Sequence, residues 1–326
     1  MALLDVSNLK VQFKTDAGSV KALSGVSFHI EPGESVGIVG ESGSGKSVSM
    51  LSVMGLLPSN AKVTADELTF NGKRIAGLSK RELRHIRGGE IGMIFQDPMT
   101  SLNPLSTVGQ QLTEPLRIHL KLGRKAARER AIELMRLVEI PAPESRLKQY
   151  PHQLSGGLRQ RVMIAMAIAC NPKLLIADEP TTALDVTIQA QILDILAELK
   201  EKLGMGIVLI THDMGVIAGL CSRVIVMYGG MICECGTVRE IFYGTKHPYT
   251  NGLLRSIPDT DPIVKSRLEP IPGSPPDMLK PPPGCPFAPR CENTMKICRM
   301  YAPEPTQISD THFSSCWLLN KPAEVA

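Results

Sequence analysis

The stretch GESGSGKS at residues 40–47 decides the fold of this chain. It fits the pattern G-x-x-x-x-G-K-[ST], follows a strand-like run at residues 35–39, and precedes a helical run over residues 47–57 that Pro58 stops. In this setting glycines let the backbone pass close to phosphate oxygens, and the amides at the start of the helix point at the anion. We therefore predict an α/β fold with a phosphate-binding loop. A chance glycine and serine turn is the alternative, but the flanking segments disfavour it.

Residues 40–47, which we call the glycine loop, have the side chains that a nucleoside triphosphate requires. We expect Lys46 to contact the β- and γ-phosphates and Ser47 to bind Mg²⁺ through its hydroxyl. We expect the remaining phosphate contacts from Gly40, Ser42, Gly43, Ser44 and Gly45.

A second segment, LLIADE at residues 174–179, is a short apolar run that ends in two carboxylates. Burying a strand that delivers two negative charges is costly unless a cation lies there. We expect Asp178 to hold Mg²⁺, directly or through water, and Glu179 to activate the attacking water. An Asp-Glu pair after a strand is more often the start of a loop, but the following TTALD at residues 181–185 disfavours that interpretation.

A third segment, LSGGLRQR at residues 154–161, completes a resemblance to the ATP-binding subunits of ABC transporters. It matches the signature motif that sets this family apart from other P-loop proteins. The resemblance implies that Ser155, Gly156 and Gly157 contact the nucleotide held by a partner subunit. Leu158 departs from the family, which often has Gln there, so any role of that Gln side chain is in doubt.

Four single residues follow the family pattern in order and spacing, although each alone would more often be ordinary packing. The resemblance implies that Phe13 stacks on adenine and that Gln96 helps to hold Mg²⁺ and reports to the membrane subunits. It further implies that Asp185 belongs to the D-loop and that His212 senses or supports the γ-phosphate. With Lys46 and Glu179, Gln96 and His212 form the predicted catalytic set.

The resemblance also implies a domain organisation. A P-loop NTPase core with a helical subdomain at about residues 97–169 is expected within residues 1–257, and residues 125–137 have the apolar spacing of an amphipathic helix. Residues 258–326 are expected to form a small Cys/Pro-rich extension. Thirteen of the 25 prolines lie in residues 258–305, which excludes long regular helices or strands there.

Eight cysteines divide into two groups. We expect structural roles for Cys170, Cys221, Cys233 and Cys235, the last two on an edge strand. The later four have the spacing C-x5-C-x6-C-x17-C. Disulfides, zinc, a [4Fe–4S] cluster and simple burial are all open for them, although a reducing compartment disfavours disulfides and zinc sites usually contain a tight C-x2–4-C pair.

A second resemblance narrows these choices. FQDPMTSLNP at residues 95–104, HPYTNGLL at 247–254 and GCPFAPRC at 284–291 look like the ATPases of the dipeptide, oligopeptide and nickel branch of ABC importers. In some members of this branch the cysteines of the extension hold a [4Fe–4S] cluster. The resemblance therefore implies cluster ligands at Cys285, Cys291, Cys298 and Cys316.

Composition is compatible with this family. The chain has 326 residues and is 43% hydrophobic, but no run approaches the roughly 18–20 apolar residues that span a bilayer, and residues 1–10 do not read as a secretory signal. A net charge of +4 is too balanced to predict nucleic-acid binding. The resemblance implies ATP and Mg²⁺ as cofactors and a position at the cytoplasmic face of the cell membrane. Its implied partners are a second ATPase subunit, two permeases and an extracytoplasmic solute-binding protein.

The function expected from these features is ATP hydrolysis that powers import of dipeptides or oligopeptides. An importer of nickel or another solute is the nearest alternative, because the solute is selected by other subunits. A soluble ABC ATPase that acts on nucleic acid is disfavoured, since the chain has one P-loop and no sustained heptads. A redox-sensing regulator would show ATPase activity that depends on the cluster without any permease.

Overall fold

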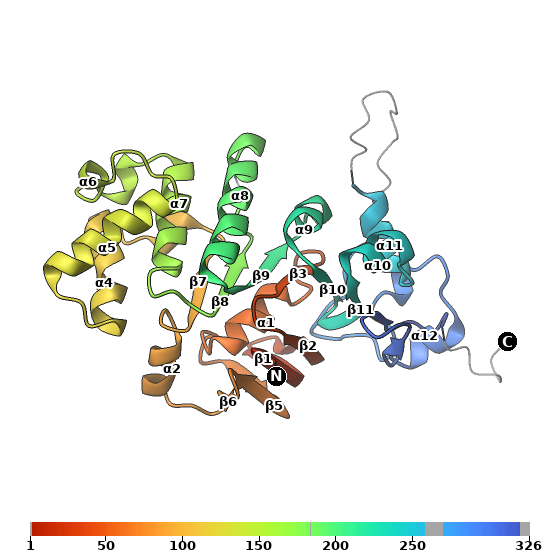
Figure 1. Ribbon diagram of the computed structural model, residues 1–326. Helices are drawn as coiled ribbons and strands as arrows, with labels where there is room; N and C mark the ends of the chain where they lie inside the picture. Colours follow the sequence, from red (N-terminus) through yellow and green to blue (C-terminus); the bar gives the residue numbers. More distant parts are fainter. Residues whose placement is uncertain (1, 183, 258–269, 320–326) are drawn as a thin grey trace, which may run out of the picture. The chain divides into compact units, whose positions relative to one another are not determined.

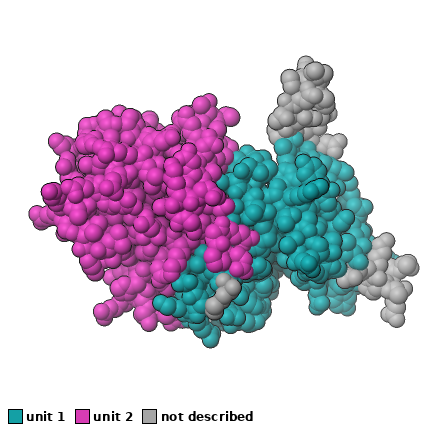
Figure 2. Space-filling model, viewed as in Figure 1, with its two compact units in different colours: residues 1–30, 35–76, 211–326 teal, residues 31–34, 77–210 magenta. Residues whose placement is uncertain are grey.

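The computed structural model describes residues 2–182, 184–257 and 270–319 (Figure 1). The chain forms two compact units (Figure 2). Unit 1 comprises Met1–Ile30, Ser35–Ala76 and Thr211–Ala326. Unit 2 comprises Glu31–Glu34 and Gly77–Ile210.

Unit 1 begins with an antiparallel sheet in the order β2-β1-β5-β6, with β4 also paired to β1. Its two long strands run antiparallel from Leu4 opposite Ile30 to Thr15 opposite Gly18. Buried and exposed residues alternate along much of both strands, which is the pattern of a sheet with one face on a core. The strands are β1 Leu4–Thr15, β2 Gly18–Ile30, β4 Ala61–Thr64, β5 Glu67–Phe70 and β6 Lys73–Arg74.

A second group of strands in unit 1 follows the order β12-β13-β11-β10-β3. Strands β3 and β10 are parallel and buried on both faces, as expected for strands that helices cover. Strand β11 pairs with β10 on one side and with β13 on the other. The prediction that Cys233 and Cys235 lie on an edge strand is therefore wrong. These strands are β3 Ser35–Val39, β10 Arg223–Tyr228, β11 Met231–Thr237, β12 Thr306–Gln307 and β13 Phe313–Ser314.

The helices of unit 1 are short. The first, α1, begins at Lys46 and ends at Val53, earlier than the predicted residue 57, because Gly55 adopts a left-handed conformation (φ 59°) that ends the helix. The other helical elements are α9 Met214–Leu220, α10 Val238–Gly244, α11 Pro248–Arg255, η2 Ala288–Arg290 and α12 Lys296–Met300.

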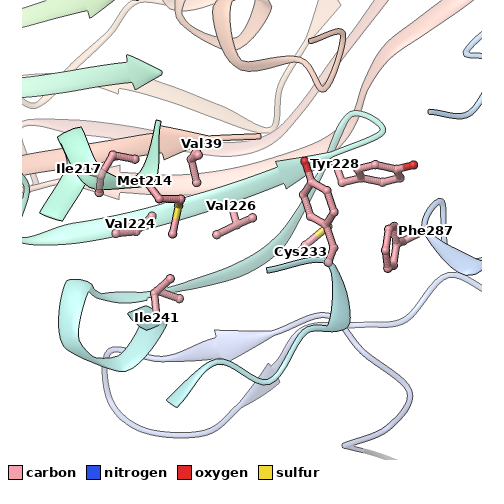
Figure 3. Packing of buried hydrophobic residues seen from close by; sticks show 10 residues of the cluster. Val39, Met214, Ile217, Val224, Val226, Tyr228, Cys233, Ile241 and Phe287 are labelled. Atoms are coloured by element: carbon pink, nitrogen blue, oxygen red, sulfur yellow. The ribbon is translucent and has the colours of Figure 1, made fainter. Parts of the chain in front are cut away.

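One core cluster of unit 1 joins early and late parts of the chain (Figure 3). Val39 of β3 packs with residues of α9 and β10, and Phe287 reaches the same cluster from near the C-terminus. The Tyr228 ring lies 4.5 Å from the Tyr249 ring and 5.3 Å from the Phe287 ring, centroid to centroid. Because each buried aromatic side chain stabilises the fold by roughly 1.5–3 kcal/mol, this cluster fixes α11 and η2 on the strands.

Unit 2 contains three parallel strands in the order β9-β8-β7, and every residue of them is buried. Its long helices confirm the helical character predicted for residues 97–169, and α5 begins one residue before the predicted helix. The strands are β7 Ile91–Ile94, β8 Leu174–Asp178 and β9 Gly206–Thr211. The helical elements are α2 Lys80–Ile86, α3 Pro98–Ser101, α4 Val108–His119, α5 Arg124–Leu137, α6 Pro143–Arg146, η1 Pro151–Gln153, α7 Gly156–Ala167 and α8 Val186–Leu203.

Among the residues that the structure describes, no helix combines the length and the apolar character that crossing a bilayer requires.

Candidate nucleotide site

The glycine loop connects β3 to α1 within unit 1, as the sequence predicts. Two of its glycines are required by close contacts. A Cβ atom on Gly40 would lie 2.1 Å from the carbonyl oxygen of Met227, and one on Gly45 would lie 2.6 Å from Cδ2 of Leu23. Gly45 also has φ 102°, which side chains other than glycine rarely adopt. The loop therefore keeps its path only with glycine at these positions.

Lys46 begins α1 and is buried, with 5% of its surface exposed. Its Nζ donates hydrogen bonds to the carbonyl oxygens of Gly40 at 2.7 Å and Glu41 at 2.9 Å. Ser44 Oγ is buried and has no hydrogen-bond partner within the described parts of the chain. An ammonium, an unsatisfied hydroxyl and the N-terminus of a helix in one loop are suited to bind a phosphate.

Glu41, which sequence reasoning did not single out, forms hydrogen bonds through both its backbone and its carboxylate. Its amide donates to the hydroxyl of Tyr249 at 2.8 Å, and its carboxylate forms two hydrogen bonds with Arg290, at 2.7 and 3.0 Å. Tyr249 lies in the HPYTNGLL stretch as the second residue of α11, and Arg290 lies in GCPFAPRC. These two stretches gave the resemblance to importer ATPases, but nothing in them indicated contact with the glycine loop.

Two other predicted residues lie in unit 1. Phe13 is half-buried on β1, opposite Val20 of β2. His212 is exposed and stands between the last residue of β9 and Asp213, which caps α9 by accepting hydrogen bonds from the amides of Gly215 and Val216. Position 212 is therefore fixed by a strand end and a helix cap.

In unit 2, Asp178 and Glu179 lie at the carboxyl end of β8, as predicted. Asp178 is 7% exposed. Glu179 has a positive φ of 46°, an uncommon conformation for a residue with a side chain, and its amide donates to the carbonyl oxygen of Ile210. Strain of this kind is often found at functional sites.

The carboxylate of Glu179 has two partners in the same unit. Gln96 Nε2 and Thr182 Oγ1 each donate to Glu179 Oε2 at 2.9 Å. The structure thus brings together Gln96 and Glu179, which lie 83 residues apart in the chain. Thr182 was not predicted, although its place in the TTALD segment was a signal.

The signature segment, residues 154–161, begins α7. Ser155 is the cap of this helix, and its Oγ accepts a hydrogen bond from the amide of Leu158 at 3.4 Å. Ser155, Gly156, Gly157 and Asp185 line one hollow on the surface of unit 2. The structure therefore brings the predicted signature residues and Asp185 together, whereas residue 183 of the same D-loop lies outside the described residues.

Hydrogen bonds hold Asp185 and the last residues of the signature segment in place beside this hollow. Asp185 caps α8 by accepting from the amide of Ile188 at 3.0 Å. Arg161 is buried and donates to the Glu139 carboxylate at 2.9 Å and to Gln191 at 2.9 Å. Gln160 donates to the carbonyl oxygen of Pro180 at 2.6 Å. The exposed start of α7 is therefore carried by a firmly held helix.

Comparison with known proteins identifies the family. The family described as ABC transporter matches residues 23–182, and the oligopeptide/dipeptide transporter C-terminal region matches residues 233–298. The dipeptide transport ATP-binding protein DppD of Bacillus subtilis (strain 168) is 54% identical over 99% of this chain and 97% of that protein. The chain belongs to the ATP-binding proteins of ABC transporters.

Other ABC proteins agree with this assignment. The oligopeptide transport ATP-binding protein OppD of the same organism is 53% identical over 98% of this chain and 90% of that protein. A solved dimer of the ATP-binding cassette MJ0796, bound to ADP and phosphate, has a TM-score of 0.66 and 33% identity, and the match covers 72% of this chain and 99% of that one. These matches confirm the predicted P-loop NTPase core and its helical subdomain, and this ABC protein is an ATPase.

The predicted iron–sulfur cluster is contradicted. Within residues 2–182, 184–257 and 270–319, no three histidine, cysteine or acidic side chains form a group that could hold a metal ion. All eight cysteines lie within the described residues, and none of them forms a disulfide. Burial raises the pKa of Cys285 to about 12, and it also raises the pKa of Cys291 and of Cys316. Without a metal ion, burial therefore favours the protonated form of these thiols.

The later cysteines instead pack as small apolar residues, with Cys298 buried and Cys285, Cys291 and Cys316 half-buried. Cys285 and Cys291 contact the aromatic core cluster of unit 1, and Cys298 is part of a second cluster with Ala288 and Ile297. The ligand set was implied by the resemblance to importer ATPases whose extension cysteines hold a cluster, because the C-x5-C-x6-C-x17-C spacing by itself left several options open. The simple burial that remained open on the residues alone describes these side chains better.

Proposed function

We propose that this ABC ATPase powers the import of dipeptides or oligopeptides across the cell membrane. The observation that supports this function most strongly is 54% identity with a dipeptide transport ATP-binding protein over 99% of the chain. The proposed complex contains a second ATPase subunit, identical or related, and two membrane permeases. An extracytoplasmic solute-binding protein supplies the peptide, and the ATPase works at the cytoplasmic face.

In the proposed site the glycine loop binds the triphosphate. The amides of the loop, including that of Ser42, and of α1 contact phosphate oxygens together with the hydroxyl of Ser44 and the ammonium of Lys46. Gly40, Gly43 and Gly45 leave room for the backbone to approach the phosphates. Lys46 exchanges its present bonds to loop carbonyls for phosphate oxygens. Phe13 stacks on the adenine, and His212 contacts the γ-phosphate.

The hydrolytic step needs an oriented water. Glu179 is the proposed base, and Gln96 and Thr182 hold its carboxylate in one position by the two 2.9 Å hydrogen bonds. Oxygen ligands suit Mg²⁺, and we assign them to Ser47, Asp178 and Gln96 Oε1. The bound cation would neutralise developing charge on the phosphate oxygens.

The signature segment serves the nucleotide of the partner subunit in this proposal. Ser155, Gly156 and Gly157 place a hydroxyl and amides at the start of α7, where the helix dipole favours an anion. Asp185 lines the same hollow and belongs to the surface that meets the partner. In the proposed cycle, ATP binding closes the pair of ATPases and hydrolysis reopens it.

We assign the ATPase to residues 1–257, with the helical subdomain at about 97–169, and the importer-specific extension to 258–326. The family match at residues 233–298 supports an importer-specific C-terminal region, and it begins before the assigned boundary at residue 258.

Transport assays test the proposed solute. Cells that lack this gene are complemented with the wild-type chain or with Lys46→Ala, and uptake of a radiolabelled dipeptide and of nickel ions is measured. We expect peptide uptake to be restored only by the wild-type chain. Restoration of nickel uptake without peptide uptake would replace the proposed solute, and no restoration of either would reject an importer of this branch.

A further inference from the structure

We infer that Arg290 is a positioning residue for the glycine loop and acts through Glu41. Arg290 lies in the C-terminal region and Glu41 is the second residue of the loop, 249 positions away in the chain. Both belong to unit 1. The inference rests on the proposed function of the glycine loop as the phosphate site.

The contact between the two side chains is a paired ion pair. Arg290 Nη1 lies 2.7 Å from Glu41 Oε2, and Nη2 lies 3.0 Å from Oε1. The arginine side chain is 5% exposed and the glutamate side chain 26%. Two parallel charge-assisted hydrogen bonds in a largely dry setting fix the direction of both side chains, which a surface ion pair does not do.

Arg290 is itself held by the C-terminal region. Its Nε donates to the carbonyl oxygen of Pro272 at 2.8 Å, and Nη2 donates to that of Ile271 at 3.1 Å. Its guanidinium lies 5.7 Å from the centre of the Tyr228 ring and 5.9 Å from that of Phe287. The guanidinium of Arg290 is therefore held in one position, and its hydrogen bonds to Glu41 position the glycine loop.

Glu41 transmits this position to the atoms that meet the nucleotide. Its carbonyl oxygen accepts from Lys46 Nζ, and its amide is bonded to the hydroxyl of Tyr249. The backbone of Glu41 is thus held on both sides while its carboxylate is held by Arg290. A change at Arg290 moves the loop at the residue next to Gly40.

The charge of Arg290 also affects the electrostatic environment of the phosphate site. A carboxylate in a loop that binds a polyphosphate repels the ligand unless a cation neutralises it. Arg290 of the C-terminal region supplies that cation. Removing the guanidinium leaves Glu41 negative beside the phosphate site, whereas removing both charges does not.

The test is a double-mutant cycle on the full chain, with Mg-ATP binding measured by calorimetry. We expect Arg290→Gln to weaken binding by about tenfold, in line with a buried charge-assisted contact. Glu41→Gln should weaken it less, and the double variant should bind better than Arg290→Gln alone. Arg290→Lys should lie between wild type and Arg290→Gln, because lysine keeps the charge but lacks the fork.

Kinetics and controls separate positioning from folding. We expect the KM for ATP to rise more than kcat falls in Arg290→Gln, with a far smaller change for Arg299→Gln, an exposed arginine of the same region. A variant is included only if its thermal unfolding is cooperative. If Arg290→Gln does not fold, the affinity and KM of Arg290→Lys are compared with those of the wild type instead.

Unchanged affinity in Arg290→Gln, or effects that simply add in the double variant, would overturn the inference. Lys46→Ala separates this outcome from failure of the proposed site. If Lys46→Ala loses ATP binding while Arg290→Gln does not, the phosphate site stands and only the role of Arg290 is rejected. If Lys46→Ala binds normally, the phosphate site itself is misplaced.

Discussion

The glycine loop and the signature segment are both glycine-rich stretches at the start of a helix, but their surroundings differ. The glycine loop is buried at Gly40 and at residues 44–46, and it is held by Tyr249 and Arg290, more than 200 residues further along the chain. The signature segment is exposed at Ser155 and Gly156 and is capped by its own serine. The same local pattern thus produces a loop completed within its own unit and a helix start that remains accessible on unit 2. This difference agrees with a nucleotide that one subunit holds and another covers.

The largest effect is expected at Glu179. Glu179→Gln keeps the size of the side chain and removes the base, so ATP turnover should fall by on the order of a hundredfold or more. Because ATP still binds, a dimer should accumulate with Mg-ATP in size-exclusion chromatography. Glu198→Gln, on an exposed part of α8, is the control. Turnover at the wild-type rate would remove Glu179 from the catalytic step.

A change in the glycine loop should act on binding. Lys46→Ala removes a buried ammonium, so affinity for Mg-ATP should fall by roughly 10- to 100-fold in calorimetry. Lys73→Ala, an exposed lysine on β6 of the same unit, should leave affinity unchanged. If the two variants bind Mg-ATP equally well, the glycine loop is not the phosphate site.

A change in the signature segment should reduce ATPase activity without reducing the affinity for Mg-ATP. A Cβ atom on Gly157 would lie 3.1 Å from Cγ2 of Ile188, so Gly157→Val displaces the start of α7 from α8. We expect ATPase activity to fall by about tenfold, from a strain of roughly 1–3 kcal/mol, while Mg-ATP affinity of the isolated chain stays unchanged. Reduced affinity in this variant would mean that both glycine-rich stretches serve the same subunit's nucleotide.

The last effect concerns pH and the segment that contacts the glycine loop, and it acts on stability rather than on ATP binding or turnover. His247 is buried, and its Nδ1 accepts from the amide of Tyr249, so the neutral imidazole is required. Burial lowers the pKa of His247 to about 4, although the Glu234 carboxylate acts in the other direction. A depressed folded pKa gives stability that is present above the unfolded pKa near 6.5 and is lost as pH falls toward 4.

The expected loss over this range is up to about 3 kcal/mol in the free energy of unfolding. His247→Asn keeps a capping oxygen without a titrating group, so its stability should change less between pH 6.5 and 4. Denaturant unfolding at several pH values measures the difference, with the exposed His29→Gln as the control. Equal slopes for wild type and His247→Asn would contradict the requirement for a neutral ring.

Much of the fold was predictable because its signals are local. Residues 35–39 form β3 as predicted, residues 125–137 lie within α5, and Asp178 and Glu179 follow a buried strand. Apolar runs, helix periodicity and glycines before a helix depend on neighbours along the chain, so the sequence alone located the glycine loop, the signature segment and the carboxylates.

The tertiary structure decided what depends on the path of the chain between distant residues. It pairs Glu41 with Arg290, pairs β11 with β13, and packs the late cysteines against apolar clusters without forming a metal site among the described residues. Cysteine spacing could not distinguish ligands from packed thiols, because the positions of sulfur atoms depend on long-range packing. Likewise, no sequence periodicity indicates that residue 41 contacts residue 290. The contact forms because the aromatic cluster of Tyr228, Tyr249 and Phe287 holds the C-terminal region next to the glycine loop.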